Sequence, residues 1–196
     1  MSNQLDASLP ATVHRVVVAL RRGGWICFWV QLVLAIISTI ILLFASLFAF
    51  GGVGANRGDP GSNGGLFFAV LGLGVLGYSI YRAFGYTRLA RTLKTAPSNL
   101  RPSKAETIKR IKAGLVWNLT GMTLTLIGAE AINGTLLAKS LSQPKGFYNA
   151  LPNLTEFIQP LDIFIVLANT HTIVAHFVGI SVSLWLLNTV FEGSKE

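Results

Sequence analysis

Residues 25–50 form an unbroken run without a single charged side chain, and this run restricts what the chain can fold into. The segment WICFWVQLVLAIISTIILLFASLFAF covers 26 positions. At about 1.5 Å of rise per residue, a helix of that length exceeds the ~30 Å hydrocarbon core of a bilayer. The apolar core of a cleavable signal is much shorter, about 7–15 residues. The run therefore predicts a transmembrane helix.

Three further apolar stretches complete an all-α, polytopic membrane fold with four transmembrane helices. The predicted spans cover about 25–50, 66–85, 113–138 and 161–190. Only 12% of the 196 residues are charged, against about 25% in a soluble domain. A Gly/Asn/Pro-rich turn is predicted at 51–65, and a proline-containing loop at 142–160. We expect one membrane domain, 1–196, solvated mainly by lipid.

Lysine and arginine lie mostly on one side of the predicted spans. The N-terminal segment carries Arg15, Arg21 and Arg22, and the C-terminal tail carries Lys195. Nine more lie within the basic loop 86–112 or just before it: Arg82, Arg88, Arg91, Lys94, Arg101, Lys104, Lys109, Arg110 and Lys112. The other side has only Arg57, Lys139 and Lys145. This distribution predicts that both termini and the basic loop are cytoplasmic or stromal.

The net charge of +8 could also indicate a nucleic-acid-binding protein. The placement of the charges argues against that, because they gather next to the ends of predicted spans. Seven of them are expected to set the topology and to contact anionic lipid headgroups: Arg82, Arg88, Arg91, Lys94, Lys109, Arg110 and Lys112. Lipid is therefore the expected partner, and nucleic acid is not.

A short amphipathic helix is predicted before the first span. Four apolar residues follow the i, i+3, i+4, i+7 pattern of one helix face: Val13, Val16, Val17 and Leu20. Ser8 suits the N-cap and Pro10 the first turn. We expect this helix to lie on the inner leaflet, with Gly23-Gly24 as a hinge into the span.

A stripe of small residues runs along the third span. Its members are spaced alternately by four and three positions: Gly114, Asn118, Gly121, Thr125 and Gly128. Residues with this spacing share one helix face and allow another helix to approach closely. The stripe predicts helix packing.

Polar residues inside the fourth span are the main candidates for function. Asp162, Asn169 and His176 are spaced by seven and follow one face. Thr172 lies on the same face. His171 points about 100° away from Thr172. His171 and His176 are five positions apart and do not share a face, which disfavours a two-histidine metal site on this helix alone.

Glu130, about eight residues inside the third span, is the remaining candidate. An ionisable group at that depth marks a functional site by default. If spans three and four pack antiparallel, Glu130 can face Asn169, Thr172 or His171. Asp162 would then open a polar path, and His176 would lie at its base. Such groups suit a proton path or a divalent ion such as iron(II), with Asp162 and His176 as metal ligands. The alternative is a set of structural interhelical hydrogen bonds.

No motif indicates an enzyme or a bound cofactor. The sequence lacks a phosphate loop, a dinucleotide fingerprint and a nucleophile elbow. Cys27 is the only cysteine, so no internal disulfide or multi-cysteine metal cluster can form. Its place at the start of an apolar run predicts a small buried residue.

Several stretches together carry a family resemblance. They are FWVQLV at 28–33, FGYTRL at 84–89, NLTGM at 118–122, LLAKSL at 136–141, LDIFIV at 161–166 and AHFVG at 175–179. With these, the chain resembles a cyanobacterial and plastid family of four-span membrane proteins, catalogued as a domain of unknown function. The resemblance covers about residues 16–190.

The resemblance implies a place in the membrane and two alternative functions. Plant members reside in the chloroplast inner envelope and have been described as an iron permease and as a component of the protein-import translocon. A cyanobacterial plasma or thylakoid membrane is expected for this chain, or the plastid inner envelope. The leading hypothesis is a metal-ion permease, for which four helices favour a homo-oligomer. The alternative is a structural or accessory subunit of a protein-translocation or photosynthetic membrane complex.

Overall fold

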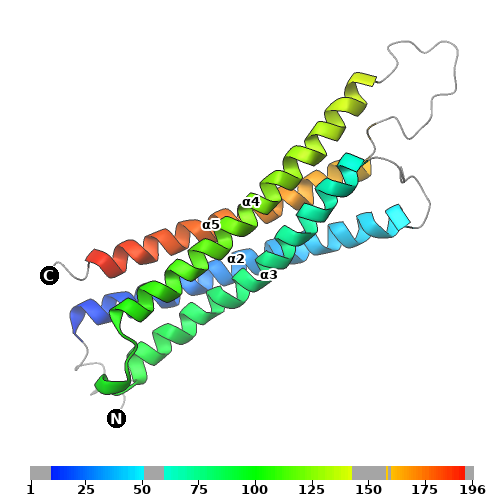
Figure 1. Cartoon of the computed structure of the whole chain (residues 1–196). Helices are drawn as coiled ribbons and strands as arrows, with labels where there is room; N and C mark the ends of the chain where they lie inside the picture. The colour runs from blue at the N-terminus through cyan, green and yellow to red at the C-terminus, as the bar shows by residue number, and fades with distance from the viewer. Residues whose placement is uncertain (1–9, 51–59, 143–157, 159, 193–196) are drawn as a thin grey trace, which may run out of the picture.

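Four long helices form one elongated bundle (Figure 1). The computed structural model describes residues 10–50, 60–142, 158 and 160–192. The helices are α2, Ala11–Phe50; α3, Pro60–Thr95; α4, Lys104–Ser142; and α5, Pro160–Glu192. Each is long and apolar enough to cross a membrane. The predicted all-α fold with four spans is therefore confirmed.

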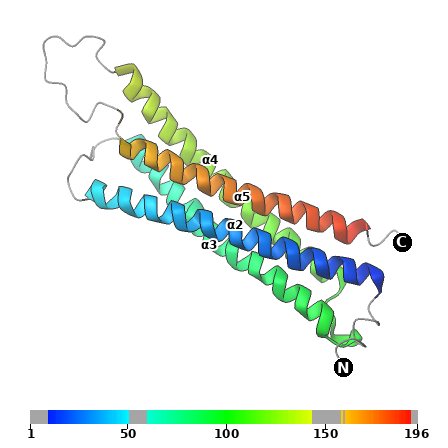
Figure 2. The same cartoon turned by 180° about the vertical axis from the view of Figure 1, so that it is seen from behind.

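Successive helices run antiparallel and close into a ring. Each helix packs against its neighbours in sequence, and α5 returns to pack against α2. Figures 1 and 2 show the start of α2 and the end of α5 at the same end of the bundle, beside the α3–α4 connection. This end holds most of the basic residues, and we call it the basic end. The far end is called the opposite end.

The predicted interfacial helix is wrong, because α2 is one continuous helix through Gly23 and Gly24. A Cβ atom on Gly23 would lie 3.0 Å from Trp185 of α5, and one on Gly24 would lie 3.0 Å from Thr87 of α3. The two glycines therefore permit close packing on both sides and do not form a hinge. The apolar stripe that includes Val17 packs into the bundle and not onto a leaflet.

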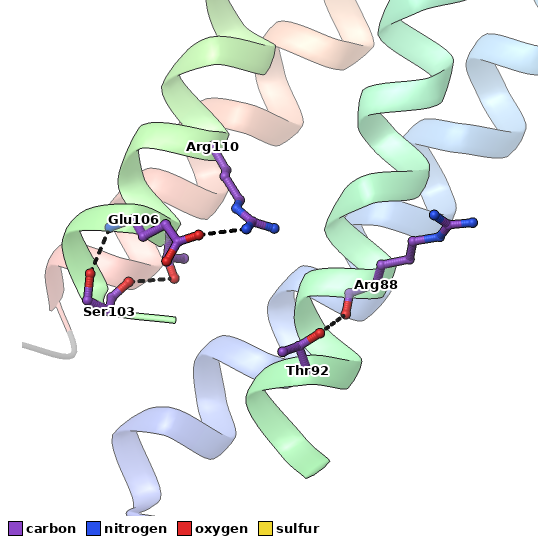
Figure 3. A network of polar contacts seen from close by, with 6 residues as sticks. Arg88, Thr92, Ser103, Glu106 and Arg110 are labelled. Atoms are coloured by element: carbon purple, nitrogen blue, oxygen red, sulfur yellow. Dashed lines mark hydrogen bonds and ion pairs between the residues drawn. The ribbon is translucent and has the colours of Figure 1, made fainter. Parts of the chain in front are cut away.

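The predicted basic loop 86–112 is helical over most of its length. Helix α3 continues to Thr95, and a short 3₁₀ turn, η1 (Ser98–Leu100), leads into α4. The Ser103 hydroxyl accepts a hydrogen bond from the Glu106 amide at 3.1 Å, which caps α4 (Figure 3). The predicted turn at 51–65 is wrong over residues 60–65, which already belong to α3. Its residues 51–59 lie outside the described residues, as do Ser8 and residues 143–157 of the loop predicted at 142–160.

The bundle has two kinds of interior. At the basic end, large apolar side chains form a core that includes Leu20, Leu89, Ile111 and Leu186. Further along, the buried positions of α3 and α4 are mainly Gly, Ala, Ser, Thr and Asn. Apolar burial stabilises helix contacts in water, whereas close packing and hydrogen bonds do so in lipid. The interior thus changes in composition along the bundle axis. The outer surface carries large exposed apolar side chains on all four helices.

Candidate functional site

A row of buried polar side chains follows the inner face of α5. Its members are Asn169, Thr172, His176 and Ser183, each at most 2% exposed. Their spacing of three, four and seven keeps them on one face of the helix. The row extends over 14 residues, or about 21 Å of helix. The prediction that Asn169, Thr172 and His176 share a face is confirmed. We call these four residues the polar row.

Asn118 of α4 joins the polar row to the rest of the bundle. Its amide nitrogen donates to the Gly114 carbonyl at 2.9 Å. Its Oδ1 accepts from Gln31 Nε2 of α2 at 2.8 Å and lies 3.2 Å from His176 Nδ1. Gln31 Nε2 also lies 3.1 Å from the Ala175 carbonyl. A backbone carbonyl can only accept a hydrogen bond, so the Gly114 and Ala175 carbonyls must face the amide nitrogens of Asn118 and Gln31 and not their amide oxygens. Helices α2, α4 and α5 thus meet at one buried node.

His176 connects the same node to α3. Its Nε2 lies 3.2 Å from the Gly72 carbonyl, while its Nδ1 faces Asn118 Oδ1. Both neighbouring atoms are oxygens that act as acceptors. A neutral imidazole can donate from one ring nitrogen only. In the neutral ring, one of these two nitrogen–oxygen contacts therefore has no hydrogen atom between its two atoms. His176 thus lies among uncharged amide and backbone groups, with an acceptor oxygen near each of its ring nitrogens.

Two glycines, Gly121 and Gly179, leave the space that the node occupies. A Cβ atom on Gly121 would collide with the His176 ring, and one on Gly179 would collide with the side chains of Asn118 and Gln31. All five residues of the predicted packing stripe, Gly114, Asn118, Gly121, Thr125 and Gly128, are buried on one face of α4. The prediction of a packing face is confirmed. The stripe serves the site as well, because Asn118 belongs to the node.

The polar row continues on both sides of His176. Towards the opposite end, Asn169 Nδ2 donates to the Thr125 carbonyl at 2.9 Å, and its Oδ1 is buried without a hydrogen-bond partner among the described residues. Towards the basic end, Ser183 Oγ donates to the Gly179 carbonyl at 2.7 Å and lies 3.5 Å from the Tyr86 hydroxyl. Gln31 Oε1 is a second buried oxygen without such a partner. Buried oxygens of this kind can accept a proton donor or ligate a cation.

Asp162 lies apart from the polar row, at the opposite end of the bundle. Its carboxylate oxygens lie 3.0 and 3.2 Å from Lys139 Nζ, which joins the start of α5 to the end of α4. His176 is 14 residues further along α5, about 21 Å away on a regular helix. The two predicted metal ligands therefore do not share one coordination sphere here. Over the described residues, no group of three or more His, Cys, Asp or Glu side chains could hold a metal ion.

Glu130 does not face the polar row, contrary to the prediction. It lies on the exposed face of α4, and Asn169 instead contacts the backbone of Thr125. The reason is helical phase: Glu130 follows the buried Gly128 by two residues, which places it about 200° around the helix. His171 is half-buried beside the polar row, and its Nδ1 has no hydrogen-bond partner among the described residues.

Sequence reasoning missed a packing stripe on α3. Its buried members alternate by four and three positions: Gly65, Ala69, Gly72, Leu76, Ser79, Ala83, Tyr86 and Ala90. The same alternation in the third span was recognised, so the pattern was available in the sequence. Gln31 and Ser38, seven residues apart on α2, were also left out of the predicted site. Ser38 Oγ donates to the Ala168 carbonyl at 2.9 Å.

The predicted lipid-facing basic residues lie at the basic end in two environments. Arg82 Nη2 donates to the Arg110 carbonyl at 2.8 Å, and the Arg110 guanidinium pairs with Glu106 at 2.6 Å. Arg88 points away from α4 (Figure 3) and lies over the Phe84 ring, 5.0 Å from its centroid. Four others are exposed: Arg91, Lys94, Lys109 and Lys112.

Fold and site together define a multi-pass α-helical membrane protein with a closed polar interior. Comparison with protein families gives the particular group. Residues 10–191 match the family described as "Protein of unknown function (DUF3611)", and the chain belongs to this family. It is 31% identical over 179 residues to "Protein TIC 21, chloroplastic" from Arabidopsis thaliana. That match covers 90% of this chain and 58% of the relative. No solved structure matches the chain.

Proposed function

We propose that this protein is a permease for a metal cation, with iron(II) as the substrate that the family resemblance suggests. The polar row carries the proposal. It brings an imidazole, amide oxygens and hydroxyls into the centre of a bundle whose outer surface is apolar. Interhelical hydrogen bonds in membranes contribute only about 0.6 kcal/mol each. Close packing at small residues also holds these helices together, so we infer that the buried polar groups serve transport in addition to joining the helices.

The polar row is closed in this conformation, because His176 has no exposed surface. Passage therefore requires the helices to separate around the row, alternately towards the basic and the opposite end. The unpartnered oxygens of Gln31 and Asn169 would supply ligands to the passing cation. Proton uptake by His176 would compensate for the departing cation charge. On this proposal, transport of the metal responds to a proton gradient.

The proposed topology places the basic end, with both termini, on the cytoplasmic or stromal side. The excess of lysine and arginine at that end supports this orientation. The membrane would be a cyanobacterial plasma or thylakoid membrane or the plastid inner envelope. A homo-oligomer is proposed as well, since a bundle of four helices leaves little room for a path within one chain.

Iron(II) uptake into proteoliposomes tests the permease. We compare the wild type with His176→Gln, Asp162→Asn and the double variant, with and without a proton gradient. Glu130→Gln is the matched control, since Glu130 lies on the exposed face of α4. We expect His176→Gln and the double variant to fall to the level of empty vesicles and the control to retain uptake. Thermal melting of each variant separates loss of transport from loss of fold. Full uptake by a folded double variant would refute the proposal.

A second candidate function is an accessory subunit of a protein-translocation or photosynthetic membrane complex. The exposed position of Glu130 on a spanning helix favours it, because a carboxyl group facing lipid alone is costly. A polar group from a neighbouring subunit would relieve that cost. A photo-crosslinker at position 130 in native membranes distinguishes an accessory subunit from a homo-oligomer. Crosslinks to other proteins support the accessory role, whereas crosslinks to a second copy support the homo-oligomer.

A further inference from the structure

A groove between α2 and α3 at the basic end combines four basic side chains with two aromatic rings. Its volume is about 380 Å³. The side chains that matter are Arg21 and Trp25 from α2, and Phe84, Arg88, Arg91 and Lys94 from α3. Among the described residues, no acidic side chain lines it. We call it the arginine groove.

The three arginines of the arginine groove, Arg21, Arg88 and Arg91, have no carboxylate partner among the residues that the structure describes. Among the described residues, neither Arg21 nor Arg91 makes an ion pair, while Arg88 rests on Phe84 instead of a carboxylate. Like charges held in one groove repel one another, and the repulsion grows near the low dielectric of a membrane. An anion bound between them would relieve this repulsion. Guanidinium groups suit a phosphate because they present parallel N–H donors.

A neighbouring pocket between α3 and α4 shows the contrast. It has a volume of about 270 Å³ and is also lined by arginines, including Arg82 and Arg110. Arg82 already donates to the Arg110 carbonyl, and Arg110 is paired with Glu106. Each of these two arginines thus already has a hydrogen-bond or ion-pair partner within the protein. The arginine groove is therefore the better anion site of the two.

Charge and apolar surface in the arginine groove are ordered along the bundle axis. Because α2 and α3 are antiparallel, the steps from Arg21 to Trp25 and from Arg91 to Phe84 both lead away from the basic end. Trp25 continues into an aromatic surface, with Trp29 stacked at 6.1 Å between ring centroids. Charge at one end and apolar surface at the other match an amphiphile.

We infer that the arginine groove binds one molecule of an anionic phospholipid. Its phosphate lies among Arg21, Arg88 and Arg91, and an acyl chain follows Trp25 towards Trp29. A free phosphate would satisfy the same donors but would leave the aromatic half of the groove without an occupant. The lipid fills both halves, and it is available where a spanning helix leaves the membrane.

Native mass spectrometry of the detergent-solubilised full chain tests the inference, with phosphatidylglycerol and phosphatidylcholine as the probes. The wild type is expected to retain one phosphatidylglycerol in preference to phosphatidylcholine. Arg88→Gln with Arg91→Gln should weaken phosphatidylglycerol binding about 25-fold, or about five-fold per arginine. Arg15→Gln with Lys104→Gln is the control, because these two substitutions remove the same charge from exposed residues that do not line the groove.

Three outcomes would overturn the inference. Equal weakening in the control variant would mean that the attraction is only that of the net charge. Unchanged binding by the folded Arg88/Arg91 variant would mean that the groove is not the site. Displacement of the lipid by millimolar inorganic phosphate would mean that the site is one for free anions. An Arg88→Lys, Arg91→Lys variant, which keeps the charge, is expected to retain most of the binding and shows that the fold tolerates change here.

Discussion

At the residue scale, Asn118 shows how few groups are needed to join four membrane helices. Its amide satisfies a carbonyl on its own helix, and its oxygen collects contacts from α2 and α5. His176 then reaches across the bundle to the Gly72 carbonyl of α3. Gly121 and Gly179 make room for the node, because the His176 ring and the amides of Asn118 and Gln31 occupy the volume that a Cβ atom on these glycines would take.

We expect Gly121→Ala to destabilise the protein by about 1–3 kcal/mol, as overpacking of a core does. The added methyl group would collide with the His176 ring, which is held at both nitrogens. Gly74→Ala is the matched control, since nothing lies within 4 Å of a Cβ atom there. Thermal unfolding in detergent measures both. Equal melting temperatures for the two variants would contradict the packing described for the node.

At the element scale, the first helix illustrates how one pattern can serve two environments. The stripe containing Val13 and Val17 has the spacing of a helix that lies on a membrane. The same spacing suits a helix that packs against Leu89 and Leu186, and this second arrangement is the one found. Sequence alone did not separate the two, because an apolar stripe does not specify what it contacts.

A continuous α2 predicts a specific distance between spin labels. His14 and Val33 are exposed positions 19 residues apart on either side of Gly23-Gly24. A straight helix places them about 28 Å apart, whereas a right-angle hinge would bring them to about 20 Å. We expect the longer distance from electron paramagnetic resonance of the double-cysteine variant, in a Cys27→Ala background. A main peak near the shorter distance would instead support a separate interfacial helix before the first span.

The pairing of α4 with α5 at the opposite end depends in part on one ion pair. Lys139 and Asp162 approach to 3.0 Å, and their side chains are 15% and 18% exposed. Lys139→Asp alone leaves two carboxylates facing each other and is expected to cost about 1–3 kcal/mol. The double variant Lys139→Asp with Asp162→Lys should recover most of this loss in thermal unfolding. A double variant no more stable than the single one would show that the pair does not hold these helices together.

At the scale of the whole molecule, the bundle is longer than the membrane it crosses. Helix α2 alone has 40 residues, about 60 Å of helix, against a hydrocarbon core of ~30 Å. The basic end contains the leucine-rich core, the kind of interior expected where helices pack in water. The polar row lies further along the bundle, with the kind of interior expected where helices pack in lipid.

The proposed orientation makes a labelling prediction. A single cysteine at the exposed Lys109 position should react with an impermeant maleimide only after the cytoplasmic or stromal side is opened to the reagent. Cys27 is buried and can be replaced by alanine to lower the background. Labelling is read by gel shift on intact and permeabilised membranes. Reaction in intact, right-side-out membranes would mean that the basic end lies on the other side of the membrane and would contradict the proposed topology.

The sequence by itself determined the medium, the number of spans and the side on which charge gathers. Composition and hydropathy are enough for these, because the cost of placing a charge or an unsatisfied peptide group in lipid does not depend on the partner helix. The periodicity of α5 also identified the shared face of Asn169, Thr172 and His176, since helical geometry fixes it. Tertiary structure alone decided what that face meets. It brought Gln31 and the Gly72 carbonyl to the node, because such contacts depend on the relative rotation of helices that a single sequence does not encode locally. The separation of Asp162 from His176 and the outward position of Glu130, in contrast, follow from helical geometry and could have been read from the sequence.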